Sequence, residues 1–188
     1  MTTIVFLLEE ASAREMLKGL LPQILPSGFD VKFIVFEGKQ HLDKELERKL
    51  RGWRLPNSTF IVLRDQDAQD CSEVKQNLTN KCLRAGRPEA IVRVACRELE
   101  SWYLGDLPAV ERALEVQGLV HLERQQLFRI PDIVVNPASE LIRITRSVYQ
   151  KVSGSRLIGR ELDPRTNRSN SFNVFVQSLR EIAETRPS

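Results

Sequence analysis

The sequence predicts an α/β fold with a mostly parallel sheet of about four strands, flanked by helices and followed by a helical C-terminal portion. Four apolar runs, at residues 3–8, 33–36, 59–63 and 90–95, are too short for independent helices and too continuous for surface segments. Segments with apolar residues at helical spacing separate these runs. Strands that alternate with helices favour right-handed crossovers and a sheet covered on both faces.

The helices between the strands are predicted from caps and apolar stripes. Ser12 with Glu15 has the spacing of a capping box and starts a helix that closes near Pro26. A charged helix follows at residues 41–51, and Asp70 is the expected N-cap of a helix from Cys71 to Ala85. The residues expected to face the core from these two helices are Leu42, Leu46, Leu50, Val74, Leu78 and Leu83.

After residue 95 the pattern is helical. Helices are predicted at residues 98–104, from the N-cap Asp106 toward residue 117, and from Asn136 onward, with a loop at residues 154–170 before the last helix. The expected stripes of these helices are Leu99, Trp102 and Tyr103, then Leu141, Thr145, Val148 and Val152, and finally Phe172, Phe175, Val176, Leu179 and Ile182, with Ser169 and Ser171 as caps. The chain thus divides into an α/β core at 1–118 and a helical extension at 119–188 packed on it.

Composition narrows the class of protein. The 188 residues are 41% hydrophobic and 28% charged, as in an ordinary globular protein. There is no apolar run of about 20 residues, and the N-terminus lacks the features of a signal peptide, so a cytoplasmic protein with no membrane partner is expected. Three cysteines without C-x-x-C spacing and two isolated histidines argue against disulfides and structural zinc, and favour buried or half-buried thiols.

Acidic residues follow three of the four predicted strands. Glu9 follows the first, Asp65 and Asp67 the third, and Glu98 and Glu100 the fourth. The carboxyl ends of parallel strands share one edge, so these side chains are expected to converge on one cleft. Oxygen ligands without His or Cys suit Mg²⁺ or Mn²⁺. The competing interpretations are solvated loop acids and, for Glu98 and Glu100, first-turn residues stabilised by the helix dipole.

The positions of these acids resemble those of a Toprim domain, the nucleotidyl-handling fold of topoisomerases, primases and overcoming-lysogenization-defect nucleases. Glu9 matches the Glu after the first strand, and Asp65-x-Asp67 matches the Asp-x-Asp after a later one. Glu10 stands where a Gly is usual.

A closer resemblance, over nearly the whole chain, is to an uncharacterised Toprim-like prokaryotic family, domain of unknown function family 4276, often encoded beside an ATPase. Three segments carry it, at residues 64–71 (RDQDAQDC), 96–106 (CRELESWYLGD) and 170–175 (NSFNVF). The resemblance implies the Toprim-like fold and a possible ATPase partner.

The preferred hypothesis is a divalent-metal-dependent nuclease acting on DNA or RNA. Glu9, Asp65, Asp67 and Glu100 would hold the ions, Glu9 could also act as a base, and Glu98 could take the place of Glu100. The window 143–168 contains seven basic and two acidic residues, a net +5. Its residues Arg156, Arg160, Arg165 and Arg168 are the predicted contacts to the phosphate backbone.

Other functions fit parts of the same pattern. A non-catalytic, Toprim-shaped subunit that binds or regulates an ATPase could keep the acids for folding. A phosphoacceptor receiver domain would need a Lys at a late strand end, where this chain has Arg97. An Asp-x-Asp glycosyltransferase would need more room for a sugar nucleotide than a short α/β portion provides.

Overall fold

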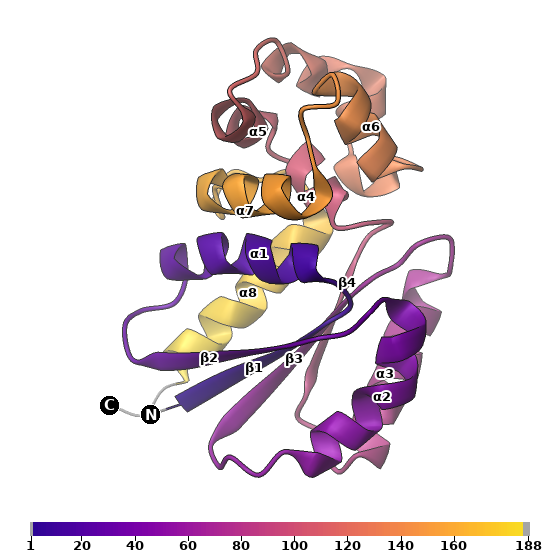
Figure 1. The fold of residues 1–188 in the computed structure, drawn as a ribbon, viewed down its shortest axis with the longest axis vertical. Coiled ribbons are helices and arrows are strands. Elements are labelled where there is room, and N and C mark those ends of the chain that lie inside the picture. Colours follow the sequence, from indigo (N-terminus) through magenta and orange to yellow (C-terminus); the bar gives the residue numbers. More distant parts are fainter. Residues whose placement is uncertain (1, 186–188) are drawn as a thin grey trace.

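The computed structural model describes residues 2–185, and it has the predicted α/β architecture (Figure 1). Its strands are β1 (Thr2–Leu8), β2 (Phe29–Val35), β3 (Ser58–Asp65) and β4 (Ile91–Ala95). Its helices are α1 (Ala11–Leu20), α2 (Lys39–Gly52), α3 (Cys71–Arg84), α4 (Glu100–Leu104), α5 (Leu107–Leu114), α6 (Pro137–Ile144), α7 (Lys151–Glu161) and α8 (Asn170–Glu184). Short 3-10 segments are η1 (Leu21–Gln23), η2 (Val120–Arg124), η3 (Gln126–Phe128) and η4 (Pro131–Ile133).

The four strands form one parallel sheet in the order β2-β1-β3-β4. Leu8 pairs with Leu63, and Asp65 pairs with Ala95, so β1, β3 and β4 end at the same edge. The two central strands are β1 and β3, whose residues Ile4–Leu8 and Phe60–Leu63 are buried. This burial on both faces explains why both strands are almost continuously apolar.

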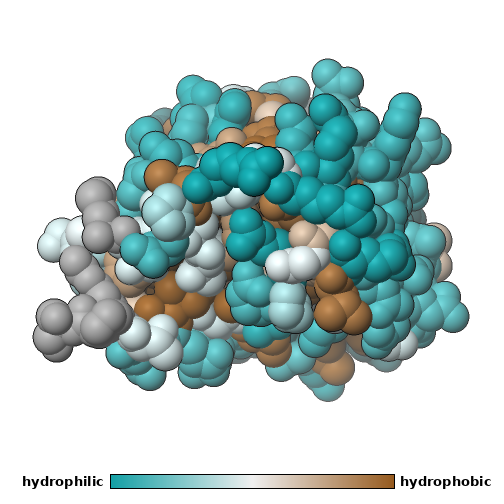
Figure 2. Space-filling model, turned by 90° about the horizontal axis from the view of Figure 1, so that it is seen from below, coloured by the Kyte–Doolittle hydropathy of each residue, from teal (hydrophilic) through white to brown (hydrophobic). Residues whose placement is uncertain are grey.

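The sheet lies between two helical layers (Figure 1). Val5 and Leu7 pack with the leucines of α2 and with Val74 and Leu78 of α3. Ile4, Phe6 and Leu8 point to the other face and join a larger core that extends through α1, α4, α5, α7 and α8. One core therefore contains residues from both the range 1–118 and the range 119–188. Seen from below, the surface is mostly hydrophilic, with small apolar patches between polar side chains (Figure 2).

Helix α7 is the main departure from the predicted structure. Residues 151–161 are helical, although Gly154, Gly159 and the neighbouring serines and arginines favoured a loop. A Cβ at Gly159 would lie 2.2 Å from the backbone oxygen of Met16, and a Cβ at Gly154 would lie 2.5 Å from the Tyr149 ring. Gly159 thus allows α7 to pack closely on α1, and Gly154 leaves space for the Tyr149 ring. This tertiary packing outweighs the poor helix propensity of the two glycines.

Three smaller predictions were also wrong. The capping box at Ser12 does not form, because Glu15 binds cationic side chains and the N-cap position is Glu10. Leu83 is 59% exposed, since the buried stripe of α3 continues from Leu78 to Cys82.

The expected helical stripe through Val148 and Val152 does not form, and both side chains are exposed. Helix α6 ends at Ile144, and Arg146 and Ser147 then have positive φ, which breaks the helical spacing.

No helix within residues 2–185 is long and apolar enough to cross a membrane.

Candidate functional site

Acidic residues from three strand ends lie near one another at the carboxyl edge of the sheet. Glu9, directly after β1, accepts a hydrogen bond through Oε2 from the backbone N–H of Asp65, at 3.1 Å. Asp65 ends β3, and its half-buried carboxylate is close enough to Glu9 and Glu100 to be affected by their charges. Glu100, in the first turn of α4, is 1% exposed. Asp65 therefore lies near an acid from each neighbouring strand end, Glu9 after β1 and Glu100 after β4.

The environment of these acids opposes their ionisation. Burial raises the pKa of Asp65 well above its usual value, and the charges of Glu100 and Glu9 add to the rise. Burial also raises the pKa of Glu9 and of Glu100. Three carboxyl groups with raised pKa at one edge form a site that a cation would stabilise in its ionised state.

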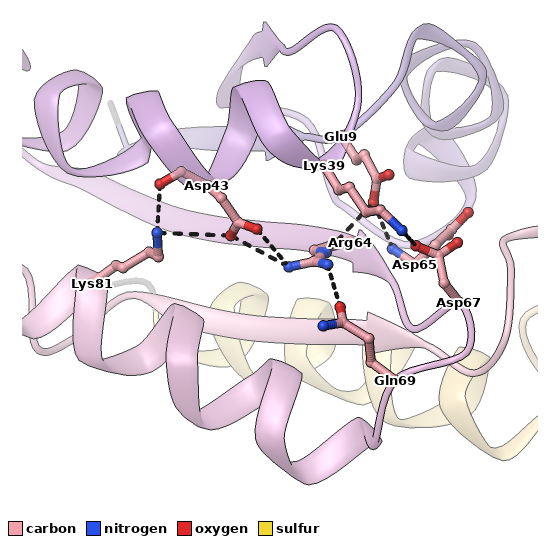
Figure 3. Close-up of polar contacts among 8 residues, drawn as sticks. All are labelled: Glu9, Lys39, Asp43, Arg64, Asp65, Asp67, Gln69 and Lys81. Atoms are coloured by element: carbon pink, nitrogen blue, oxygen red, sulfur yellow. Dashed lines mark hydrogen bonds and ion pairs between the residues drawn. The ribbon is translucent and has the colours of Figure 1, made fainter.

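Asp67 belongs to the same edge but has a cationic partner. Its Oδ2 lies 2.9 Å from Nζ of Lys39, the first residue of α2 (Figure 3). Its backbone is in the left-handed region, with φ of 57°, and its N–H donates to the carbonyl of Arg97 at 2.7 Å. Asp tolerates this conformation, so the turn after β3 can be tied to the turn after β4.

Glu98 has its hydrogen-bond partner in a different element. Its Oε2 accepts a hydrogen bond from the backbone N–H of Ala138, at 2.8 Å, in the first turn of α6. The interpretation as a first-turn residue of the helix after β4 thus holds for Glu100 and not for Glu98, which binds the first turn of α6 instead. Of the two acids after β4, Glu100 is the one next to Asp65.

Sequence reasoning missed the residues that surround Glu100. Tyr149 donates its hydroxyl hydrogen to Oε1 of Glu100 at 2.8 Å, while Oε2 of Glu100 has no partner among the described residues. Lys151, at the start of α7, forms an ion pair with Glu10 and lies close enough to Asp65 and Glu100 to affect their pKa values. Tyr149 and Lys151 lie about 50 positions after Glu100 in the sequence, so no local pattern predicted their role.

Arg64 was also missed, although it stands inside the Asp65 motif. Its side chain points away from Asp65 and binds the Asp43 carboxylate at 3.2 and 3.3 Å and Oε1 of Gln69 at 2.6 Å (Figure 3). Its Nε is 3.9 Å from Oε2 of Glu9. Because the side chain is buried, Arg64 holds Glu9, α2 and the turn after β3 in a fixed arrangement.

The donor set fits a divalent cation in its chemistry. All the candidate ligands are carboxylates, and the unpartnered Oε2 of Glu100 supplies a free buried oxygen. A small cavity beside Glu9 and Asp65 has roughly the space of one water molecule or ion. In residues 2–185, however, no three His, Cys, Asp or Glu side chains are already grouped closely enough to coordinate one ion. Binding would therefore require the carboxylates to turn toward one another.

The four predicted phosphate-binding arginines differ in their environment. Arg156 and Arg160 are exposed on α7, and Nε of Arg156 donates to Glu15 at 2.7 Å. Arg165 is exposed and makes two contacts of 3.1 Å with the Asp163 carboxylate. Arg168 instead donates to the carbonyls of Phe128 and Leu104, at 2.7 and 3.0 Å, so it serves the fold.

Several structural interpretations were correct. Asp70, Asp106 and Ser169 accept backbone hydrogen bonds as N-caps of α3, α5 and α8. Trp102 is fully buried in the core, and its indole N–H donates to Oγ of Ser171 at 2.9 Å, which connects α4 to α8. The prediction that Ser171 caps α8 was wrong, because its side chain binds Trp102 instead.

The three cysteines are free, and Cys82 is buried while Cys71 and Cys96 are half-buried. Burial raises the pKa of Cys82 and of Cys96 to about 11, which disfavours the reactive thiolate.

Comparisons with known proteins bear on the whole chain. A family model described as a domain of unknown function (DUF4276) matches residues 8–180. Comparison with curated proteins gives no match. A solved structure of the C-terminal region of the OLD protein of Xanthomonas campestris pv. campestris aligns over 96% of this chain and 95% of its own, with a TM-score of 0.49 and 13% identity. The corresponding region of the Burkholderia pseudomallei OLD protein aligns over 96% and 98%, with a TM-score of 0.44 and 13% identity. No residue-by-residue correspondence follows from such values.

Proposed function

Since the chain belongs to the DUF4276 family, whose description leaves the activity open, we propose that it is a divalent-metal-dependent phosphodiesterase acting on nucleic acid. The observation that carries the proposal is the gathering of Glu9, Asp65 and Glu100 from three strand ends, each with a raised pKa. Such a concentration of carboxyl groups is costly for folding, and a functional cation would account for it. The resemblance of the Glu9 and Asp65-x-Asp67 motifs to Toprim domains supports the same activity.

Glu9, Asp65, Asp67 and Glu100 would hold Mg²⁺ or Mn²⁺. When bound, the ion would supply Lewis-acid polarisation of a phosphoryl oxygen and a lowered pKa for bound water. Asp67 would exchange its ion pair with Lys39 for the cation. The unpartnered Oε2 of Glu100 is free for the same purpose, while Oε1 is held in place by Tyr149.

Side chains around the acids would bind and orient the substrate. Glu9 has a raised pKa, which makes it a better acceptor of a proton from an attacking water than an ordinary carboxylate. The ammonium group of Lys151 lies close to Asp65 and Glu100 and would attract a phosphate to the acids. Arg156, Arg160 and Arg165 are exposed and would bind the phosphate backbone, whereas Arg168 is engaged in the fold.

The test is cleavage of single- and double-stranded DNA and RNA by the wild type and by Asp65→Asn, with Mn²⁺ or with EDTA. Asp30→Asn is a matched control, because Asp30 is a carboxylate on β2 that pairs only with Lys32 among the described residues. Wild type and Asp30→Asn should cut only with metal, and Asp65→Asn should be inactive while retaining nucleic acid. If the wild type cuts nothing with Mn²⁺, either alone or with a co-encoded ATPase, the phosphodiesterase proposal is wrong.

A second candidate is a non-catalytic subunit that binds an ATPase. It is favoured by a run of exposed apolar side chains in the C-terminal part, including Ile130, Ile133 and Val135, which are 54%, 62% and 69% exposed. Ile133→Ser with Val135→Ser should then reduce complex formation with a co-encoded ATPase, measured by size-exclusion chromatography. Asp65→Asn should leave that complex intact.

A further inference from the structure

A surface pocket lined by arginines lies at the end of α7 opposite the acids. Its volume is about 530 Å³, within the range of small-ligand sites. Helices α5, α7 and α8 and the turn between the last two all contribute to it. Its charged lining residues are Arg112, Arg160, Glu161, Asp163, Arg165 and Arg180.

The charge of this arginine pocket is positive. Four arginines face two acids, Glu161 and Asp163, which leaves a formal charge of four minus two, or +2. Arg112 and Arg165 pair with these acids, and Arg180 donates to the carbonyl of Pro164 at 3.1 Å.

These contacts leave donors unused in the arginine pocket. Each guanidinium carries five N–H donors, so the contacts of Arg112, Arg165 and Arg180 occupy only part of their capacity. The backbone carbonyl of Arg160 accepts a hydrogen bond from Gln23, whereas its side chain makes no hydrogen bond or ion pair with any described residue. The pocket therefore offers several free guanidinium donors, which suit phosphate oxygens.

Helix α7 connects the arginine pocket to the acids. Lys151 begins α7 beside Glu10, and Glu161 ends α7 at the pocket. A helix rises about 1.5 Å per residue, so the two sites are separated by roughly 15 Å along α7. At the duplex rise of about 3.4 Å per nucleotide, this is the length of roughly four to five stacked nucleotides. Arg156 lies between them on the same helix.

We propose that the arginine pocket binds phosphate groups and anchors a nucleic-acid strand whose scissile bond lies at the acids. This assignment of the strand's path rests on the proposed phosphodiesterase function. No aromatic ring lines the pocket, so it has no stacking platform for a base, and it would hold the backbone without reading the sequence. A free polyphosphate has the same chemistry and is the other possible source of the phosphates.

The test uses the full chain with Asp65→Asn added and EDTA present, so that binding is measured without cleavage. The pocket variant is Arg160→Gln with Arg180→Gln, which leaves the Arg112 and Arg165 ion pairs intact. Arg143→Gln is a matched control, because Arg143 is an exposed arginine on α6, paired with Glu140 and not part of the pocket lining. Unchanged circular dichroism would establish that each variant is folded.

Binding of single-stranded oligonucleotides of 3 and 10 nucleotides is measured by fluorescence anisotropy at several salt concentrations. Pocket substitution should weaken binding of the longer strand about tenfold or more and lower the slope of log affinity against log salt by roughly 1.4 for two lost contacts, whereas the trimer, too short to reach both sites, should bind the intact pocket more weakly than the longer strand does. Arg143→Gln should change neither. Equal binding by the pocket variant and the control would overturn the proposal.

Tripolyphosphate distinguishes the two sources of phosphate. It should raise the melting temperature of the protein with an intact pocket and not that of the pocket variant. Protection by tripolyphosphate without any effect on the 10-nucleotide strand would keep the phosphate site and overturn the strand anchor. Loss of strand binding in the pocket variant, with no metal-dependent cleavage by the wild type, would keep the anchor and overturn only the phosphodiesterase function.

Discussion

Replacement of Glu15 by Gln should weaken the attachment of α7 to α1. Glu15 is 2% exposed, and its carboxylate accepts hydrogen bonds from Lys18 and Arg14, both at 3.0 Å, and from Arg156 of α7 at 2.7 Å. These partners, led by Lys18, lower the pKa of Glu15 from 4.5 to about 2. The contact matters for function because α7 also carries Lys151 to the acids.

The lowered pKa of Glu15 gives the expected loss of stability. Lowering it from 4.5 to about 2 corresponds to about 3.4 kcal/mol of preference for the ionised form in the folded state. The side chains of Arg14, Lys18 and Arg156 are 38%, 52% and 54% exposed, so water and salt screen these ion pairs. About 1–2 kcal/mol of stability should therefore be lost in Glu15→Gln, or roughly 2–8 °C in melting temperature for a chain of this size.

The loss should depend on pH in a defined direction. A carboxyl group whose pKa is lower in the folded state stabilises the protein above its unfolded pKa, here 4.5. This stabilisation disappears as the pH falls toward about 2, where Glu15 becomes protonated in the folded state too. The difference between wild type and Glu15→Gln should be largest above about pH 5 and should shrink through the acid range.

Thermal unfolding followed by circular dichroism between pH 3 and 8, at low and high salt, measures this difference. Glu45→Gln is the control, since Glu45 pairs with Arg48 of the same helix and connects no separate elements. It should have a much smaller effect. The reasoning would be refuted if Glu15→Gln melted like the wild type at neutral pH, or if its deficit did not change as the pH was lowered.

Three further perturbations test the site and its support. In EDTA, Asp65→Asn should raise the melting temperature near neutral pH, because burial raises the pKa of Asp65 and its ionised form therefore destabilises the folded state. In thermal unfolding, this gain in melting temperature should be absent below about pH 4 and should grow with pH. Millimolar Mn²⁺ should raise the melting temperature of the wild type by mass action, and Asp67→Asn should reduce that rise; no shift in the wild type would contradict a metal site. Gly159→Ala should cost about 1–3 kcal/mol in denaturant unfolding, because the added Cβ would lie 2.2 Å from the Met16 oxygen, whereas Gly52→Ala, with open space around the Cβ, should not destabilise.

Much of the fold follows from local patterns in the sequence. The strands were predictable because buried parallel strands need continuous apolar residues, and the caps at Asp70 and Asp106 because a side chain bonds its own first turn. The three acidic strand ends were predictable for a topological reason, since parallel strands deliver their carboxyl ends to one edge. These features depend on short-range spacing, which can be recognised in the sequence alone.

The tertiary structure decided what depends on distant residues. Helix α7 packs on α1 where Gly159 approaches the backbone of Met16, and no local spacing in the sequence indicates that contact. The separation of Glu98, which binds α6, from Glu100, which binds Tyr149, likewise depends on elements placed about 40 and 50 residues later. Sequence determined which chemical groups reach the edge of the sheet, while long-range packing determined which of them face one another, because burial and charge act through space and not along the chain.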